Sequence, residues 1–229
     1  MPVYKKVNKD FFKKWSKEMS YVLGFFAADG YITVNKRGGQ FLCVQITDKK
    51  LLESIKKIMG AEQAIGVRPP DKSKSNEKIL YRLQIGSVEM CNDLRALGFS
   101  ERKTKSLAVP NVPNKYFPDF VRGYFDGDGN VWVGDIHKER KTKTKAILVA
   151  FTSGSYGFLK KLQEKLHLHG LGFGYIYGSK KGNYYRLQFS TLSALKLYDI
   201  MYNRNIKDFL GLYLDRKKKV FEKFKRLRL

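Results

Sequence analysis

The chain has 229 residues, which is enough for one large domain or for two small ones that each bury a core. A hydrophobic fraction of 43% and an aromatic fraction of 14% exclude a disordered chain, although 29% of the residues are charged. Lys and Arg number 45 against 21 Asp and Glu, so the net charge is +24 and a polyanionic partner is expected.

The positive charge is shared by both halves of the chain. Residues 1–114 contain 21 basic and 11 acidic side chains, and residues 115–229 contain 24 and 10. This distribution favours nucleic acid, which presents many phosphates at once, over a membrane surface, which would call for a basic amphipathic helix. The sequence indicates no small-molecule substrate.

The apolar stretches are too short for a membrane span. The longest, residues 21–28, contains Gly24 and falls far short of the roughly 20 residues that a spanning helix needs. The basic N-terminus has no apolar core followed by a cleavage site, so we expect an intracellular protein, in the cytoplasm and nucleoid or in an organelle matrix. Cys43 and Cys91 stand singly and are expected to be reduced, buried thiols.

The chain repeats itself, which indicates a duplicated domain. Three segments recur in the same order: Val22–Gly30 as Val121–Gly129, Tyr81–Ile85 as Tyr185–Phe189, and Glu101–Lys105 as Asp215–Lys219. The stretch around Pro110 and Pro113 breaks any helix and forms a stiff connector. We therefore predict a first repeat over residues 1–108, a linker over 109–116 and a second repeat over 117–229.

Each half follows the pattern helix, two strands, helix, two strands, helix. The apolar spacing in the first half predicts helices over 16–28, 49–59 and 89–97, and strands over 31–34, 41–46, 63–68 and 79–85. The second half predicts helices over 117–127, 158–166, 194–201 and 212–227, and strands over 131–133, 146–152, 174–177 and 184–189. The fold class is therefore α+β, with two tandem αββαββα repeats.

A pair of small residues four positions apart occurs in each copy of the first repeated segment. Gly24 with Ala28, and Gly123 with Gly127, would let two helix backbones approach closely along a pseudo-twofold axis. Asp29 and Asp128 would then lie side by side at two helix C-termini, where negative charge is disfavoured. A hard divalent cation relieves such a pair, so the sequence predicts a site for Mg²⁺ or Mn²⁺ that could activate water at a phosphodiester.

The two nine-residue segments Val22–Gly30 and Val121–Gly129 resemble the LAGLIDADG motif, and the whole chain resembles a single-chain, two-repeat LAGLIDADG homing endonuclease. The resemblance implies a monomer with antiparallel, saddle-shaped sheets on either side of the paired motif helices. It further implies a DNA endonuclease that requires Mg²⁺, with Mn²⁺ as a substitute and with Ca²⁺ binding without supporting cleavage.

The same resemblance assigns roles to individual residues. The last acidic position of each motif binds metal, which gives Asp29 and Asp128, with the backbone of Ala28 and Gly127 as further ligands. The earlier acidic position is occupied only by Asp126, which is expected to be a neighbour of the site. The remaining implied catalytic residues are a water-ordering strand residue, Gln45, with Ala150 as its expected counterpart, and one lysine per repeat, Lys103 and Lys217, with Lys105 and Lys219 as adjacent competitors.

In the family, the strands of both sheets follow the major groove of DNA, which admits a two-stranded ribbon. Strand alternation sends only about half of the candidate side chains to the groove, and lysines at hairpin tips are expected to hold phosphates. The first-half candidates are Tyr31, Thr33, Asn35, Arg37, Gln40, Arg68, Lys72, Lys74, Tyr81, Arg82 and Gln84. The second-half candidates are His137, Lys138, Arg140, Lys141, Lys143, Lys145, Tyr175, Tyr177, Lys180, Lys181, Tyr184, Arg186 and Gln188.

The function expected from this sequence is site-specific double-strand cleavage of DNA, with a long asymmetric recognition site and a staggered cut. An intron-encoded RNA maturase and a DNA-binding protein without cleavage activity are the alternatives on the same scaffold, since basic strands suit both DNA and RNA. Homing would place the gene in an intron or intein, and the Met1 start favours a free-standing or intron-encoded product. His167 and His169 lack a third ligand at zinc spacing and are not expected to bind metal.

Overall fold

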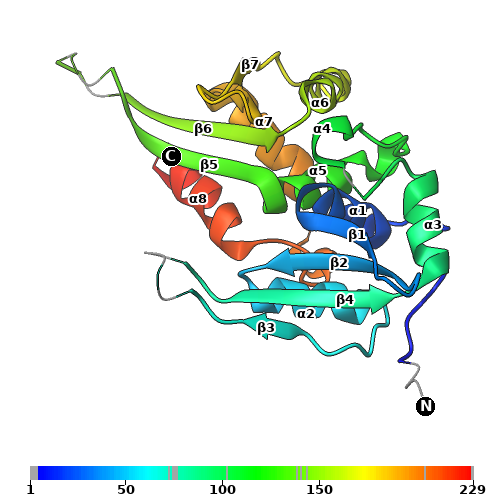
Figure 1. The fold of residues 1–229 in the computed structure, drawn as a ribbon. Helices are drawn as coiled ribbons and strands as arrows, with labels where there is room; N and C mark the ends of the chain where they lie inside the picture. Colours follow the sequence, from blue (N-terminus) through cyan, green and yellow to red (C-terminus); the bar gives the residue numbers. More distant parts are fainter. Residues whose placement is uncertain are drawn as a thin grey trace.

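A computed structural model describes residues 5–71, 73, 77–101, 103–137, 139, 141–142, 144–203 and 205–227, with the backbone alone at Lys103, Thr104 and Ile206. It contains two four-stranded antiparallel sheets that lie on either side of a central helix pair (Figure 1). The predicted α+β class with two repeated halves is thereby confirmed. Within the described residues, no helix combines the length and the apolar composition that crossing a lipid bilayer requires.

The first half begins with a helix that ends at the first repeated aspartate. The Ser16 side chain accepts a hydrogen bond from the Met19 amide, which fixes the start of this helix. Asp48 and Ser87 cap the next two helices in the same way. The elements are α1 Lys17–Asp29, β1 Gly30–Val34, β2 Gln40–Ile46, α2 Lys49–Ile58, β3 Gly66–Arg68, β4 Leu80–Gly86, α3 Val88–Ala96 and α4 Lys103–Ser106.

The second half repeats this order with longer strands in its first hairpin. A 3-10 turn, η1 Asn114–Tyr116, leads from the connector into the second motif helix. The elements that follow are α5 Phe117–Asp128, β5 Gly129–Ile136, β6 Thr144–Ser153, α6 Tyr156–Leu168, β7 Tyr175–Gly178, β8 Tyr185–Phe189, α7 Thr191–Tyr202, η2 Ile206–Phe209 and α8 Asp215–Arg226.

The two sheets have the same topology, with strand orders β1-β2-β4-β3 and β5-β6-β8-β7. On each sheet, alternate side chains point towards the helices and enter the core, as Ile32, Val44 and Leu83 do in the first sheet. The other face of each sheet carries no helix and is called here the open face. Its side chains follow from the strand registers, which pair Gly30 with Val44 and Gly129 with Phe151.

The motif helices α1 and α5 pack directly on each other. A Cβ atom on Gly24 would lie 2.1 Å from the carbonyl oxygen of Phe120, and one on Gly123 would lie 2.0 Å from that of Tyr21. Each glycine thus meets the backbone three residues before the other glycine, as a twofold relation requires. Only glycine permits this approach, so the small-residue pattern does bring the two helices together.

Candidate active site and nucleic-acid interface

The structure brings the ends of the two motif helices together. A Cβ atom on Gly127 would lie 2.3 Å from the Cβ of Ala28 and 3.1 Å from Oδ2 of Asp29, so the Asp29 carboxylate lies against the last turn of α5. The negative charges of both Asp29 and Asp128 act on Tyr124 and on Lys217. Both carboxylates therefore face one small region, and both are partly exposed.

Lys217 lies beneath this region, at the C-terminus of α5. Its side chain is only 6% exposed, and Nζ donates hydrogen bonds to the carbonyl oxygens of Phe125 at 2.6 Å, Asp126 at 2.8 Å and Gly129 at 2.6 Å. Burial lowers the pKa of Lys217 to about 8, against the opposing effects of Asp126 and the two motif aspartates. Its ammonium group thus satisfies carbonyls that the helix end leaves open.

The competing lysines are located differently. Lys219 is exposed and pairs with Asp215 at 2.5 Å on the surface of α8, so Lys217 is the lysine of this cluster that reaches the aspartates. In the first repeat, Lys105 is exposed on α4, while the Lys103 side chain lies outside the described residues.

Strand register corrects the predicted counterpart of Gln45. Extending the β1–β2 register by one residue beyond Gly30 and Val44 places Gln45 opposite Asp29. The same extension beyond Gly129 and Phe151 places Thr152, and not Ala150, opposite Asp128. Arg82 pairs with Gln45 and Arg186 with Thr152, which agrees with this assignment. The prediction for Ala150 is wrong because it aligns Phe151 with Ile46, whereas the strand registers align Phe151 with Val44.

Tyr124 belongs to the site but was missed from the sequence. Its hydroxyl donates a hydrogen bond of 2.8 Å to the carbonyl oxygen of Thr152, beneath the aspartates. Burial, and then the charge of Asp128, raise the pKa of this phenol well above its usual value. The signal was available, because the first motif has Phe25 where the second has Tyr124.

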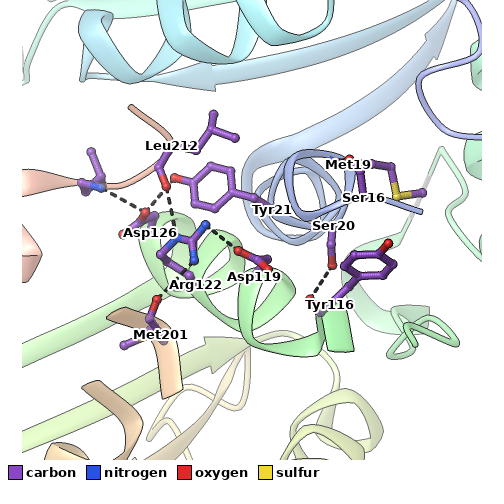
Figure 2. Close-up of polar contacts among 11 residues, drawn as sticks. Ser16, Met19, Ser20, Tyr21, Tyr116, Asp119, Arg122, Asp126, Met201 and Leu212 are labelled. Atoms are coloured by element: carbon purple, nitrogen blue, oxygen red, sulfur yellow. Dashed lines mark hydrogen bonds and ion pairs between the residues drawn. The ribbon is translucent and has the colours of Figure 1, made fainter. Parts of the chain in front are cut away.

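A buried polar network supports the second motif helix from the other side (Figure 2). The Arg122 side chain, on a residue that is 2% exposed, pairs with Asp119 at 2.8 Å and donates to the carbonyl oxygens of Leu212 and Met201 at 3.1 and 3.2 Å. These contacts fix the segment between α7 and α8 onto α5.

Asp126 is part of this network and not of the carboxylate pair. The Tyr21 hydroxyl donates to its Oδ2 at 2.7 Å, and the Leu214 amide donates to the same oxygen at 3.0 Å. Burial raises the Asp126 pKa to about 6, although these bonds and the positive charges of Lys217 and Arg122 act in the opposite direction. Its placement agrees with the expected role as a neighbour.

The donors at the helix ends fit a hard divalent cation. Two carboxylates converge there, and oxygen is the ligand atom that Mg²⁺ and Ca²⁺ prefer. The Gly127 carbonyl oxygen accepts a long hydrogen bond of 3.3 Å from Lys217, which leaves a second lone pair for the predicted metal contact. Among the described residues, no group of three or more His, Cys, Asp or Glu side chains could hold a metal, and His169 stacks on Phe117.

The open face of the first sheet collects five of the nine first-half DNA candidates that the structure describes. Arg82 and Gln84 alternate along β4 and, through their register partners, lie on the same side as Tyr31, Thr33 and Gln45. Gln45 and Arg82 also line a groove of about 310 Å³ together with Arg68, which pairs with Glu77 at 3.2 Å.

Four first-half candidates are placed otherwise. Gln40 lies on the helix side, where it accepts a hydrogen bond of 2.7 Å from Arg95. It is therefore absent from the open face, where a DNA contact was predicted for it. Tyr81 also lies on the helix side, opposite Ile46. Asn35 accepts hydrogen bonds from the Arg37 and Gly39 amides in the hairpin turn, and Arg37 is exposed there.

The open face of the second sheet carries a matching set. Gln188 pairs with Tyr175 and Arg186 pairs with Tyr177, so all four side chains share this face. Lys145 instead pairs with Asp135 on the helix side. The exposed second-half candidates outside the strands are His137, Lys141, Lys180, Lys181 and Tyr184. Lys72, Lys74, Lys138, Arg140 and Lys143 lie outside the described residues.

Comparison with known proteins gives a consistent result. A family model for a LAGLIDADG-like domain matches residues 16–95. An uncharacterized protein of Methanocaldococcus jannaschii is 26% identical over 160 residues, which are 67% of this chain and 50% of that protein. A probable translation initiation factor IF-2 of Thermococcus kodakarensis is 30% identical over 196 residues, or 80% of this chain and 15% of that protein. The chain thus spans half or less of these relatives.

Solved structures with the same fold are related at low sequence identity. The LAGLIDADG meganuclease I-AabMI bound to uncleaved DNA matches with a TM-score of 0.58 and 16% identity, over 90% of this chain and 88% of that chain. The homing endonuclease I-LtrWI bound to target DNA matches with a TM-score of 0.54 and 14% identity, over 96% and 90%. I-SmaMI bound to an uncleaved DNA target in the presence of calcium ions matches with a TM-score of 0.54 and 16% identity, over 93% and 90%.

Proposed function

From its membership of the LAGLIDADG family, whose domain it carries and whose single-chain, two-repeat fold it has, we propose that this chain is a site-specific DNA endonuclease. It acts as a monomer and breaks both strands of a long, asymmetric target with a staggered cut. The observation that carries this proposal is the convergence of Asp29 and Asp128 at the ends of two helices whose backbones touch at Gly24 and Gly123.

The carboxylates of Asp29 and Asp128 would hold the divalent metal, with Mg²⁺ or Mn²⁺ supporting cleavage and Ca²⁺ supporting binding alone. When bound, the metal supplies a polarised water and neutralises the charge that develops on the phosphate. Gln45 and Thr152, opposite the two aspartates, present side chains that hydrogen-bond and orient water. Lys217 holds the C-terminal turn of α5, and thereby Asp128, in place.

The open faces of both sheets support DNA as the substrate. No described strand places a carboxylate on its open face, although the chain contains 21 Asp and Glu residues. Each face instead carries one Arg-x-Gln pair, Arg82 with Gln84 and Arg186 with Gln188. Arg and Gln are the side chains that pair with guanine and adenine in the major groove. The structures of similar fold include proteins bound to DNA targets.

The test begins with selection of bound sequences from a randomised double-stranded library in Ca²⁺, followed by cleavage of a plasmid that carries the selected sequence. In Mg²⁺ we expect the wild type to linearise this plasmid. Asp29→Asn and Asp128→Asn should each reduce cleavage by at least about a thousandfold, since each removes a charge on which transition-state stabilisation depends. Both variants should still bind the selected DNA in Ca²⁺.

Asp10→Asn, which changes an exposed carboxylate that pairs with Lys13 and lies outside both motifs, is the matched control and should cleave normally. Intact plasmid under every metal and salt condition, together with tight binding of intron RNA, would favour the maturase alternative. Binding of DNA without cleavage by the wild type would favour the DNA-binding alternative.

A further inference from the structure

The first hairpin of the second repeat is longer than its counterpart. β5 and β6 have 8 and 10 residues, whereas β1 and β2 have 5 and 7. Three extra residues in each strand extend the hairpin by about 10 Å, at about 3.3 Å per residue. The extension points away from the α1–α5 pair, as Figure 1 shows, so it reaches beyond the pseudosymmetric part of the molecule.

The middle of this hairpin's open face is apolar, between Asn130 at one end and Thr144 at the other. Trp132 pairs with Leu148 and Gly134 pairs with Ala146, and these four residues are called here the apolar strip. Its accessible side chains are those of Trp132 and Leu148, because Ala146 is only 3% exposed. The Trp132 side chain is exposed, with 43% of the residue surface accessible. A Cβ atom on Gly134 would lie 2.2 Å from Cζ2 of Trp132, so the indole covers Gly134 and lies along the strand.

The two repeats differ at the apolar strip, but the neighbouring strand positions hold the same residue types. Arg82 with Gln84 and Arg186 with Gln188 occupy equivalent register positions in the two sheets. The position equivalent to Trp132 in the first repeat is Thr33, and the position equivalent to Leu148 is Phe41. The first hairpin has already ended where Gly134 and Ala146 pair. The second repeat therefore differs from the first by the tryptophan in place of Thr33 and by the apolar pair Gly134 and Ala146 in the longer hairpin.

The occupant of this face is expected to be the major groove of DNA. The open face has no carboxylate in its described strands, and the strip continues directly into the strand positions that hold Arg186 and Gln188. In the major groove, the C5-methyl group of thymine is the apolar feature of the base edges, and the other groups there are hydrogen-bond donors and acceptors. An apolar side chain placed against those polar groups would leave them unpaired.

We propose that the apolar strip recognises thymine methyl groups at the outer end of the half-site bound by the second repeat. This inference rests on the proposed function and adds the base composition of one half of the target. An extension of about 10 Å spans about three base pairs, since the bases of one strand are about 3.4 Å apart. The two half-sites should accordingly be unequal in length, and the longer one should carry thymines at its outer positions.

The inference is tested on the sequence selected from the randomised library in Ca²⁺, with deoxyuridine replacing single thymines so that only the methyl group is removed. We expect substitutions at the outer positions of one half-site to weaken binding about fourfold each, which is the effect of one lost methylene-sized apolar contact. Substitutions in the other half-site should change binding by less than about twofold.

Trp132→Thr, which introduces the residue found at the equivalent position of the first repeat, should abolish the sensitivity to deoxyuridine. Val34→Thr is the matched control, because Val34 is an exposed strand valine on the helix side of the first sheet. That variant should keep both the selected sequence and the sensitivity.

Failure of this inference can be distinguished from failure of the proposed function. If DNA is bound but no outer thymine responds to loss of its methyl group, the inference is overturned and the endonuclease proposal stands. If Trp132→Thr folds, by its thermal unfolding, and keeps the full sensitivity, the assignment to the strip is also overturned. Absence of any sequence-selective DNA binding would instead contradict the proposed function itself.

Discussion

Corresponding residues of the two motif helices do different work. Arg122 and Asp119 form a buried ion pair in α5, whereas Leu23 and Ser20 occupy the same motif positions in α1. The charged pair is retained where a second chain segment must be held, because Arg122 also binds the backbone of Met201 and Leu212. The two motifs thus differ at these positions because only α5 has to hold the segment between α7 and α8.

This asymmetry leads to a prediction about stability. Arg122→Leu should lower the free energy of unfolding by about 3–5 kcal/mol, because it removes the guanidinium group that pairs with the buried Asp119 carboxylate. The double variant Asp119→Ser with Arg122→Leu recreates the first motif and should recover at least 1 kcal/mol of that loss, on the order of one buried polar group. Urea unfolding of the three proteins measures both effects, and strictly additive losses would contradict the role given to the pair.

Lys217 gives a second prediction at this scale. Lys217→Met keeps most of the side-chain stem but removes the donors to the α5 carbonyls, and it should cost about 2–4 kcal/mol of unfolding free energy as well as cleavage activity. Lys219→Met is the control, since its ion pair with Asp215 is exposed and should contribute less than about 1 kcal/mol. Equal losses in both variants would show that the cap at α5 is unimportant.

Individual site residues could be predicted from the sequence only where the same residue type recurs at the same position of both repeats. Asp29 and Asp128 stand at the same place in both motifs, and the structure does bring them together. The sequence could not distinguish Lys217 from Lys219, because it does not show which face of α8 packs against α5. The pairing of Thr152 with Asp128 needed a strand register, which the unequal hairpin lengths conceal. The burial of Arg122 could not be foreseen because an arginine in an amphipathic helix is normally exposed.

The helices and strands were easier to predict than the residues. Every long helix was predicted from the sequence, and each of them, α1, α2, α3, α5, α6, α7 and α8, buries an apolar face. The ends of β5 and β6 were missed because the strip on their open face interrupts the alternation on which strand prediction depends. The short helix α4 was also missed, because four residues contain too little of a helical period to detect.

The glycine contact between α1 and α5 can be tested directly. Gly24→Ala or Gly123→Ala should destabilise the protein by about 3 kcal/mol or more, because the added methyl group must push a backbone carbonyl aside. The cleavage rate should fall by more than the loss of folded protein explains, because the two aspartates then move apart. The measurements are chemical denaturation and the single-turnover cleavage rate.

Gly157 provides a control for these variants within the same class of element. It lies in α6, where a Cβ atom would meet nothing closer than 3.9 Å. Gly157→Ala should therefore leave stability unchanged or raise it by up to about 1 kcal/mol, as expected for a helical glycine with free space. A comparable loss at Gly24 and at Gly157 would contradict the contact.

At the scale of the whole molecule, charge and shape are arranged around the open faces. The net charge of +24 is spread over both halves, while the one carboxylate within the described strands, Asp135, lies on the helix side of its sheet. Sequence composition alone predicted a polyanionic partner but could not separate the two faces of a sheet. That separation depends on the strand pairing.

Salt dependence separates contacts to bases from contacts to phosphates. Arg186→Ala, on the open face, should cost about 1–3 kcal/mol of discrimination at one base pair. Lys141→Ala, near the hairpin tip, should weaken binding to all sequences alike and reduce the slope of log K against log salt by about 0.9. Equilibrium binding at several salt concentrations distinguishes the two, and identical behaviour of the variants would contradict the assignment.

The residues opposite the two aspartates are not the same, since Gln45 faces Asp29 and Thr152 faces Asp128. A primary amide and a secondary alcohol hold a water molecule differently, so the two scissile bonds would react in chemically unequal surroundings. Hydrolysis of a supercoiled circle should then proceed through a transient open-circular product, broken on one preferred strand before the linear form accumulates.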